Sequence, residues 1–324
     1  DWLMKILFLS RWFPYPVNNG SKLRIHNLLR GLAKSHEVTL LSFTDDPLTN
    51  AETTVLQGIC SECYTVPWSE FNPDSNPARM GFLSSTPRSL VDTYSAQMEN
   101  EIRRLLSEKD YDLVIASQTT MASYYQAFGK TPAIFEELEL GIFYDPVYLT
   151  SNGLERYRQL LTWLKLKAYV SRLLRSFAAI TMASSREFSI FKETFPQFEK
   201  KASVIPNCID LSQYAVTGID LQPDSLIFSG SFRYRPNYDA MLWFLNEVFL
   251  LILEQVPDAC LLITGDHANL PLPHLKNVHL TGHVDDIIPL IASCSVSVVP
   301  IFGGGGTRLK IIEAMAVGTP VVST

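Results

Sequence analysis

Short apolar runs alternate with amphipathic stretches along the chain. The first run, "KILFLS" (5–10), is apolar throughout, as in a strand covered on both faces. Residues 21–35 then place Leu23, Leu28, Leu29 and Leu32 at helical spacing. Further strand-like runs follow at 37–43, 112–117, 133–137, 178–184 and 202–207. This alternation predicts an open parallel sheet with helices on both faces.

The pattern restarts after a polar, turn-rich stretch at 206–224. A long helix is expected at 238–256, and strands are expected at 224–230, 259–265, 277–282, 296–302 and 320–324. We therefore predict an α/β protein of two Rossmann-like, doubly wound parallel-sheet domains, 1–206 and 207–324, that face a cleft. Ligands of such sheets bind beyond the carboxyl ends of the strands, where Gly230 and Gly265 stand.

Four consecutive glycines, 303–306, separate the strand at 296–302 from a helix expected at 307–317. Backbone N–H groups at a helix N-terminus are unpaired and carry partial positive charge, and glycine lets an anion approach them. Arg308 and Lys310 follow directly, in a stretch that holds only five lysines and arginines against eleven acids after Asn207. These features predict a phosphate or diphosphate cradle, with a flexible loop as the alternative. Neither a Walker loop nor a G-x-G-x-x-G fingerprint is present.

Two further side chains are candidates for ligand contact. Glu313 lies two turns into the expected helix among apolar neighbours, where an unpaired charge is costly, so we favour a ribose ligand over a solvated position. His26 lies one turn into the helix at 21–35 and is predicted either to line the cleft or to be a surface histidine.

The segments "GGGGTRLKIIEAMAVGTPVVST", "VIPNCID", "FSGSFRYRPNYDAMLWF" and "HLTGHVDDIIPLIASCSVSVVP" resemble glycosyltransferase family 4. The likeness is strong over 202–324, fair over 4–45 and weak between. It implies the GT-B fold, a nucleotide-sugar donor, an acceptor-side N-terminal domain and retention of anomeric configuration. A complete second domain of this family continues past Thr324, so we expect the C-terminal domain here to be incomplete, with weak turnover and self-association through its exposed flank.

The resemblance also implies residue roles. Glu313 matches the second glutamate of the family's E-x7-E motif and should bind ribose. Gly265 and the pair His283-Val284 should border the nucleoside, and Gly20 should approach the diphosphate or sugar from the other domain. The donor diphosphate should be held by Gly303, Gly304, Gly305, Gly306 and Thr307.

The sequence departs from the family pattern at two places. The first glutamate of E-x7-E would fall at Gly305, as in a branch that carries G-G-G-T-R-L-K there. The usual diphosphate arginine and lysine would fall at Ser231 and Pro236. Candidate substitutes for these cations are Arg233, Arg235, Arg308 and Lys310.

Charge considerations predict a mechanism without a metal. The single D-x-D, Asp110 to Asp112, precedes a strand and so should lie at the amino end of the sheet. Preorganised N–H dipoles and cations can stabilise the leaving diphosphate instead. No cofactor other than the donor substrate is expected. "FEELEL" supplies Glu136, Glu137 and Glu139, which are acceptor contacts or solvated acids, with a nucleophilic role as a lesser option.

Composition narrows the setting and the partners. The net charge of −6 and the lack of a basic–aromatic pattern argue against nucleic acid. No apolar run is long enough for a membrane span, and five cysteines, including a lone "CSEC" at Cys60 and Cys63, fit a reducing cytoplasm. The acceptor is unidentified. The expected helix at 154–178 carries six cations, which indicates either a solvated face or peripheral contact with the inner face of a membrane.

Two other functions remain open at this point. One is a nucleotide-sugar epimerase of the same architecture, which would act on the donor without an acceptor. The other is a non-catalytic fragment of a longer protein.

Overall fold

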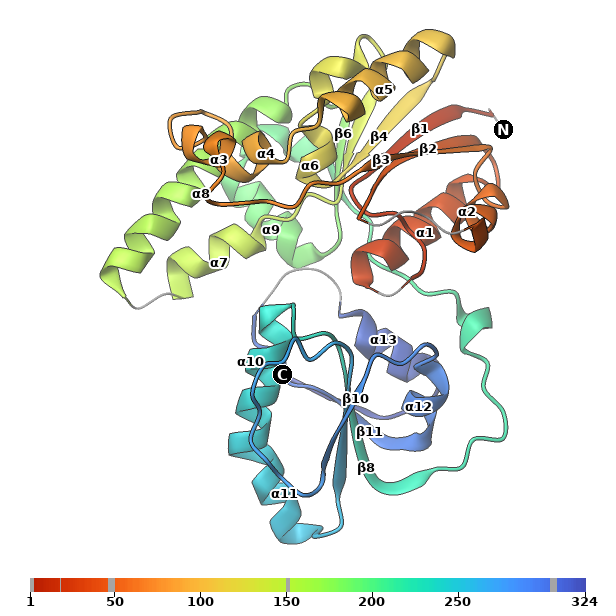
Figure 1. Ribbon diagram of the computed structural model, residues 1–324, viewed down its shortest axis with the longest axis vertical. Helices are drawn as coiled ribbons and strands as arrows, with labels where there is room; N and C mark the ends of the chain where they lie inside the picture. Colours follow the sequence, from red (N-terminus) through yellow and green to blue (C-terminus); the bar gives the residue numbers. More distant parts are fainter. Residues whose placement is uncertain (1–2, 18, 46–49, 150–151, 304–307) are drawn as a thin grey trace. The chain divides into compact units, whose positions relative to one another are not determined.

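The computed structural model of the 324-residue chain describes residues 3–17, 19–45, 50–149, 152–303 and 308–324. The chain divides into two compact units, one up to Asn207 and one from Cys208 on. Each unit is an α/β layer structure around a parallel sheet (Figure 1).

The first unit has a seven-stranded sheet in the order β3-β2-β1-β4-β5-β6-β7, and its described strand pairs are all parallel. Its strands are β1 Lys5–Ser10, β2 Glu37–Thr44, β3 Glu62–Pro67, β4 Leu113–Ser117, β5 Ala133–Glu136, β6 Ala179–Met182 and β7 Ala202–Val204.

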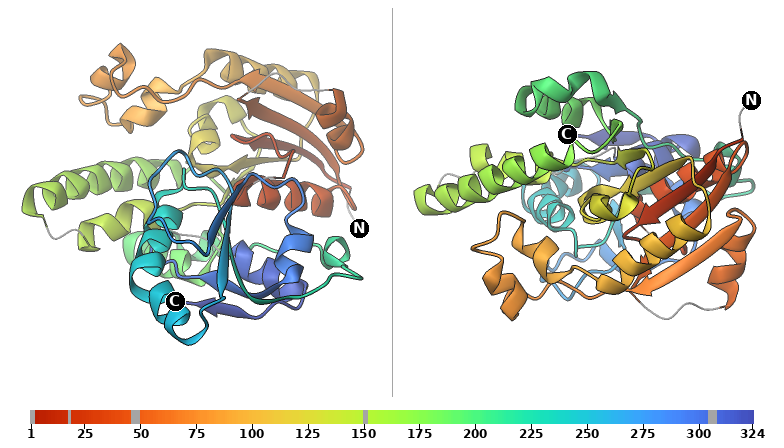
Figure 2. Two further views of the ribbon diagram at one scale, coloured as in Figure 1. Left: turned by 60° about the horizontal axis from the view of Figure 1, so that its bottom comes forward. Right: turned by 90° about the horizontal axis from the view of Figure 1, so that it is seen from above.

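The helices of this unit connect the strands and cover both faces of the sheet. They are α1 Gly20–Leu32, α2 Asn50–Gln57, α3 Asn76–Met80, α4 Arg88–Asp92, α5 Ala96–Glu108, α6 Gln118–Ala122, α7 Gly141–Leu149, α8 Gly153–Leu173 and α9 Ser185–Thr194. Short 3-10 segments follow α6 and α9, at η1 Tyr125–Phe128 and η2 Pro196–Lys201. Figure 2 shows α7 and α8 side by side, extending away from the sheet of their unit.

The strand β1 shows why these residues form a doubly covered sheet. Successive side chains of a strand point to opposite faces. Leu7 and Leu9 accordingly join a core cluster with α5 and α8, while Ile6 and Phe8 join another cluster with α1 and α2. All four are fully buried, so an unbroken apolar run is what this strand requires.

The second unit has a five-stranded parallel sheet in the order β10-β9-β8-β11-β12. Its strands are β8 Gln222–Ser229, β9 Cys260–Thr264, β10 Val278–Gly282, β11 Cys294–Val299 and β12 Val321–Ser323. Phe228 packs in a cluster with α10 and α11, and Ile227 packs on the other face in a cluster with α12 and α13.

One long helical segment covers a face of the second sheet. It consists of α10 Arg235–Trp243, a π-helical turn η4 Phe244–Val248, and α11 Phe249–Gln255. The remaining elements of this unit are η3 Leu211–Tyr214, α12 Ile288–Ser293 and α13 Leu309–Ala316.

The predicted fold class of two parallel-sheet α/β domains is confirmed, and each predicted strand is present within a few residues. The hydrophobic pattern did not predict β3 or several helices between β2 and β6. β3 is an edge strand that pairs only with β2 among the described strands, and its burial is partial, so its sequence lacks a continuous apolar run.

Predicted helices differ at their ends from those in the structure, and the helix expected at 21–35 is α1, which ends at Leu32. The helix expected at 154–178 is α8 and ends at Leu173, because residues 174–176 form a turn before β6. The helix expected at 307–317 is α13, which begins at Leu309.

The "CSEC" thiols occupy structural positions. Cys60 is buried in a core cluster and Cys63 lies within β3. Burial raises the pKa of Cys60 to about 12 and that of Cys63 to about 11. Thiols with such high pKa values hold little thiolate, so they are poor nucleophiles.

Candidate active site at the carboxyl ends of the strands

The candidate site of the second unit lies where its sheet changes direction of winding. β8 and β11 are neighbours in the sheet, and the strands that follow each of them lie on opposite sides. At such a switch point the connections leave toward opposite faces and leave room for a ligand at the carboxyl ends of the strands. Gly230 follows β8 there, and residues 300–308 follow β11.

Two glycines bring the ends of β8 and β9 together without side chains. Gly230 has φ 151° and Gly265 has φ 106°, values that side-chain-bearing residues rarely adopt. A Cβ on Gly265 would lie 2.8 Å from the carbonyl carbon of Gly230. A Cβ on Gly230 would lie 2.8 Å from Nζ of Lys310. Gly265 therefore lets the two backbones approach each other, and Gly230 leaves space for the Lys310 side chain.

Lys310 points from α13 to the end of β8. Its Nζ donates a hydrogen bond of 3.0 Å to Oδ1 of Asn237 and lies 4.2 Å from the ring centroid of Phe228. Burial lowers the pKa of Lys310 to about 7, and the nearby Arg308 adds to the decrease. The amine is therefore poised to take up a proton when an anion arrives.

Glu313 lies one turn further along α13. Its Oε1 accepts a hydrogen bond of 3.2 Å from the hydroxyl of Tyr214, which is buried. Burial raises the pKa of Glu313, although Tyr214 and Lys310 partly offset the increase. The carboxyl group is half-buried and is therefore held in one place rather than solvated.

The other predicted residues of this unit are placed as follows. Arg308 caps α13 and its Nη1 donates to the carbonyl of Gly303 at 3.4 Å. Gly304 to Thr307, predicted to hold the diphosphate, lie outside the described residues. Since α13 begins at Leu309, the helix terminus predicted at Thr307 is displaced by two residues.

The two arginines near β8 are exposed and paired with acids. Arg233 forms an ion pair with Asp266, and Arg235 forms one of 2.8 Å with Asp239. Among the candidate substitutes for the family's diphosphate cations, Lys310 has its charged group at the glycine pair. His283 and Val284 follow β10, next to the strand that ends before Gly265, with His283 exposed.

Gly20 and His26 belong to the first unit, on α1. Gly20 begins the helix, and the Asn19 side chain caps it by accepting from the N–H of Lys22. His26 is half-buried, and its Nδ1 has no hydrogen-bond partner among the described residues. Burial, and next Arg30, lower the pKa of His26, so the ring is neutral near pH 7.

A buried charged cluster lies at the carboxyl ends of β4 and β5 in the first unit. Arg24 Nε donates to Glu136 Oε1 at 2.7 Å, and Arg24 Nη1 donates to the carbonyl of Ile205 and to Oδ1 of Asn207, each at 2.7 Å. Ser117 Oγ donates to Glu136 Oε2 at 2.7 Å. Arg24 Nη2 is buried and has no partner within the described chain.

Glu137 is the residue after β5 and belongs to the same cluster. Its Oε2 accepts from Nε2 of Gln118 at 3.0 Å, and its Oε1 lies 3.6 Å from Nε of Arg24. Burial, then the carboxyl groups of Glu136 and Glu139, raise the pKa of Glu137 to about 8. Glu137 is therefore mainly protonated at neutral pH, and its acid can donate a hydrogen bond.

Backbone conformation also distinguishes this cluster. Gln118 and Glu137 follow neighbouring strands and have φ of 66° and 55°. Side-chain-bearing residues in the left-handed region are uncommon and collect at functional sites.

The expectation that Glu136 and Glu137 are solvated loop acids is wrong, since their exposed fractions are 4% and 5%. No local pattern indicated their partner Arg24, because it lies 112 positions from Glu136 in the sequence.

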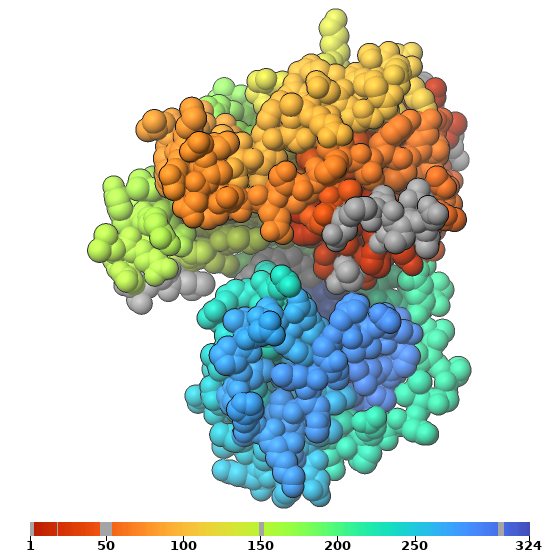
Figure 3. All heavy atoms as spheres, in the orientation of Figure 1, coloured from red at the N-terminus to blue at the C-terminus, as the bar shows by residue number. Residues whose placement is uncertain are grey.

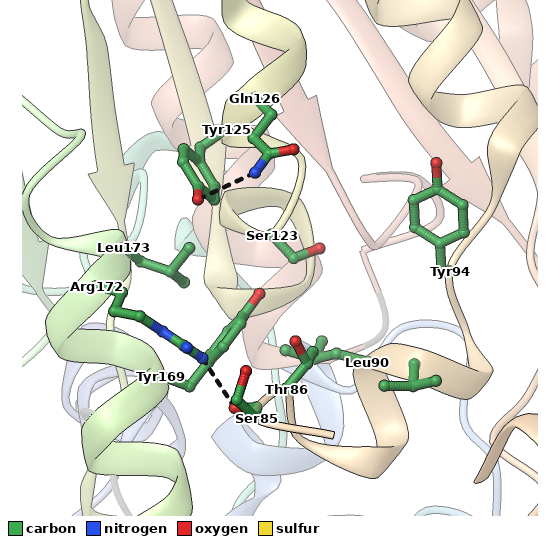
Figure 4. Close-up of a pocket in the computed structure, with 11 residues that line it drawn as sticks. Ser85, Thr86, Leu90, Tyr94, Ser123, Tyr125, Gln126, Tyr169, Arg172 and Leu173 are labelled. Carbon is green, nitrogen blue, oxygen red and sulfur yellow. Dashed lines mark hydrogen bonds between the residues drawn. The ribbon is translucent and has the colours of Figure 1, made fainter. Parts of the chain in front are cut away.

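A cavity of about 500 Å³ lies on the same unit, between α4, the α6–η1 segment and α8 (Figure 4). Tyr169 lies in the middle of its lining, and Arg172 donates to the carbonyl of Ser85 at 2.9 Å beside it. Hydroxyl groups and aromatic rings line the cavity together, a mixture that suits a partly polar ligand.

The D-x-D motif, Asp110 to Asp112, lies where the sequence predicts, at the amino end of the sheet. Asp112 directly precedes β4, and its Oδ2 accepts from the N–H of Lys5 at the start of β1 at 2.8 Å. It is a structural carboxylate at the opposite end of the strands from Gln118 and Glu137.

Each unit's candidate site contains residues that the sequence patterns did not predict, Asn237 and Tyr214 in the second unit and Arg24 and Gln118 in the first. Asn237, Tyr214, Arg24 and Gln118 each make a hydrogen bond described above. Asn237 lies in the segment "FSGSFRYRPNYDAMLWF". A polar residue in the first turn of an otherwise apolar helix could have indicated its role. Tyr214 carried none, because it lies in the polar linker.

The buried cluster predicts a pH dependence of stability that depends on Glu137. Its pKa is about 8 in the folded protein and near 4.5 when unfolded, so the folded state holds the extra proton between these values. Stability should therefore fall as pH rises from 5 to 8. In Glu137→Gln, the free energy of unfolding should decrease by about 3 kcal/mol less between pH 5 and 8 than in the unaltered protein, because each pKa unit corresponds to about 1.4 kcal/mol.

Denaturant unfolding at a series of pH values measures this difference. Glu99→Gln is the control, because the pKa of Glu99 is lowered by Tyr94 and Arg103 and titrates below this range. Parallel pH profiles of Glu137→Gln and the unaltered protein would contradict the prediction.

Comparisons with known proteins agree with this architecture. The family model described as Glycosyltransferase Family 4 matches residues 18–213, and one described as Glycosyl transferases group 1 matches residues 223–324. An uncharacterised 44.6 kDa protein in the cps region of Klebsiella pneumoniae is 22% identical, with 99% of this chain and 83% of that protein covered.

Solved structures show the same fold at low identity. The Anabaena protein Alr3699/HepE, crystallised with UDP and glucose, superposes with a TM-score of 0.63 at 16% identity, over 99% of this chain and 80% of that one. A trehalose-6-phosphate structure from E. coli bound with UDP-2-fluoro glucose gives a TM-score of 0.57 at 11% identity, over 98% and 83%. Since the Glycosyltransferase Family 4 model matches residues 18–213, more than half of the chain, the protein belongs to that family and is a glycosyltransferase with the GT-B fold.

Proposed function

We propose that the protein transfers a sugar from a nucleoside-diphosphate sugar to an acceptor hydroxyl, with retention of anomeric configuration and without a metal. The observation that carries this proposal is the group around Lys310. Gly230 and Gly265, which follow β8 and β9, leave space beside the half-buried amine of Lys310. A nucleoside diphosphate fits this chemistry, since it offers negative charge to Lys310 and a ribose diol to Glu313. The neighbours crystallised with UDP and UDP-sugars support this donor class.

In this proposal each residue acts on charge that develops during transfer. The bond between the anomeric carbon and the diphosphate oxygen breaks, and negative charge grows on the diphosphate. Lys310 in its protonated form, Arg308 and the backbone of residues 303–307 stabilise that charge, which is commonly the largest catalytic contribution. The acceptor oxygen bonds to the anomeric carbon on the face that the diphosphate leaves, and its proton passes to a diphosphate oxygen.

The buried cluster of the first unit supports this direct route over a double displacement. A double displacement needs an ionised carboxylate free to attack the sugar. Glu136 is engaged by Arg24 and Ser117, and Glu137 is mainly protonated near pH 7. We assign these residues and His26 to the acceptor side, expect Gly20 to approach the donor diphosphate or sugar, and leave the acceptor itself open. The five cysteines are free thiols, which fits the proposed cytoplasmic location.

Binding of UDP should take up a proton through Lys310. The pKa of the free amine is about 7, so at pH 8 it is mostly neutral, and a bound diphosphate should raise that pKa and charge it. Calorimetry at pH 8 in buffers of different ionisation heat should give nearly one proton taken up per UDP. Lys310→Met should remove this uptake and weaken binding, whereas Lys276→Met, an exposed lysine before β10, should change neither. Equal heats in all buffers for the unaltered protein would overturn the assignment of Lys310.

Glu313→Ala should weaken UDP binding by about 1.5–3 kcal/mol, because it removes charge-assisted hydrogen bonds to ribose. A cycle with 2′-deoxy-UDP isolates that contact: the deoxy ligand should bind the unaltered protein less tightly than UDP, while the variant should distinguish the two much less. Glu254→Ala on the exposed face of α11 is the matched control. Unchanged affinity of the variant for UDP would place the ribose elsewhere.

The chemistry can be tested before the acceptor is known, by using water as the acceptor. Slow hydrolysis of an α-linked UDP-sugar should release the α-anomer first, as seen by NMR before mutarotation, and should continue in excess EDTA. Release of the β-anomer would indicate inversion, and complete loss of activity in EDTA would indicate a required metal. Conversion of the donor into its 2-epimer without release of UDP would instead identify an epimerase.

A further inference from the structure

Large apolar side chains are concentrated on one projecting part of the first unit. Leu83 is 95% exposed and Leu154 is 85% exposed, and Phe82, Tyr157, Leu161 and Leu164 are also exposed. We call these six residues the hairpin surface, since four of them lie on α8, which forms a hairpin with α7. Apolar side chains gathered in this way mark an interaction site, unlike single exposed leucines.

The helix α8 has two apolar faces of different kinds. One face, with Trp163, Leu166 and Leu173, is buried in the core. The other face bears Leu154, Tyr157, Leu161 and Leu164, which lie within about 80° of one another at 3.6 residues per turn. Residues 153–158 and 160–162 are all exposed, so the first turns of α8 project beyond the core.

Cations flank the exposed face of α8 on both sides. At about 100° per residue, Arg156 and Lys167 lie on one side of the apolar stripe, and Arg158 and Lys165 on the other. Residues 141–178 contain six lysines and arginines and only two acids. One of these acids, Asp145, pairs with Arg186 of α9. An apolar stripe between two rows of cations is the pattern of a helix lying in a membrane interface.

The loop after α3 extends the same surface. Lys165 Nζ donates to the carbonyl of Gly81 at 2.5 Å, which places Phe82 and Leu83 beside α8. The guanidinium of Arg88 lies 4.3 Å from the ring centroid of Phe82 and adds another cation there. In Figure 3 the segment around residues 70–90, in orange, lies directly beside the yellow-green atoms of the α7–α8 hairpin.

We propose that the hairpin surface rests on an anionic lipid bilayer and holds the protein at the membrane. Its apolar side chains would enter the region between headgroups and acyl chains, while the exposed guanidinium groups of Arg156 and Arg158 would contact anionic headgroups. Each cation near an anionic bilayer adds about 1 kcal/mol of attraction. A neutral bilayer lacks this electrostatic attraction. None of the described helices is long and apolar enough to cross a membrane, so the contact is peripheral. Two copies of the hairpin surface would repel each other, because both are positively charged and hold few acids. A protein partner would have to present its own acidic residues to this surface.

The test is co-sedimentation of the purified protein with vesicles of phosphatidylcholine alone or mixed with phosphatidylglycerol. The protein should bind the mixed vesicles at least tenfold better, and high salt should weaken that binding. Leu154→Ser/Leu161→Ser should reduce binding about tenfold or more, since each exposed leucine loses its membrane contact. Arg156→Gln/Arg158→Gln should reduce binding to the mixed vesicles by about tenfold, and binding to neutral vesicles little.

The matched control is Leu250→Ser/Leu251→Ser on α11 of the second unit, where both leucines are exposed at 45% and 57%. These variants should bind as the unaltered protein does, and the melting curves of all variants should overlap because the altered residues are exposed. The proposal is overturned if mixed and neutral vesicles bind equally, or if the Leu154 and Leu161 changes have no more effect than the control. It is also overturned if, without lipid, the protein is a dimer that those changes dissociate. The readout is binding, so its failure would leave the proposed transfer reaction untouched.

Discussion

The strand pairs described in both sheets are all parallel, and this constraint determines where the protein can place chemistry. A parallel sheet is covered on both faces by the helices that connect its strands, so its interior is closed to ligands. The carboxyl ends remain accessible, most of all where the winding reverses. Lys310 and Gly230 lie at that point in the second unit, beside β8 and β11. In the first unit, Gln118 and Glu137 follow β4 and β5 at the same end of their sheet.

Ionisable groups at these strand ends are only partly compensated. Lys310 has one amide oxygen and an aromatic ring beside it, and within the described chain its amine forms no ion pair with a carboxylate. Glu137 shares one guanidinium with Glu136, so three carboxyl groups including Glu139 surround a single cation. Both arrangements shift the pKa toward the neutral form, and a ligand of opposite charge would reverse the shift. Such groups are unfavourable for folding alone and favourable for binding, which is typical of functional sites.

The helix α8 combines a structural and a surface role in one segment. Its second half supplies Trp163, Leu166, Tyr169 and Val170 to the core of the first unit. Its first half carries leucines that the unit leaves exposed between cations. A second, exposed row of large apolar residues therefore distinguishes α8 from α5, in which Met98, Ile102 and Leu105 are buried and Leu106 is partly buried.

The sequence by itself determined the local properties of this protein. The apolar runs located the described strands except β3, and the four glycines beside Arg308 and Lys310 identified the region of the donor site, because spacing and residue type are local. Only the tertiary structure decided which charges meet. Arg24 reaches Glu136 across 112 positions of sequence, and Tyr214 reaches Glu313 across 99. It also decided that Glu137 is buried and that Arg233 faces Asp266, because burial and ion pairing depend on which segments the fold places side by side.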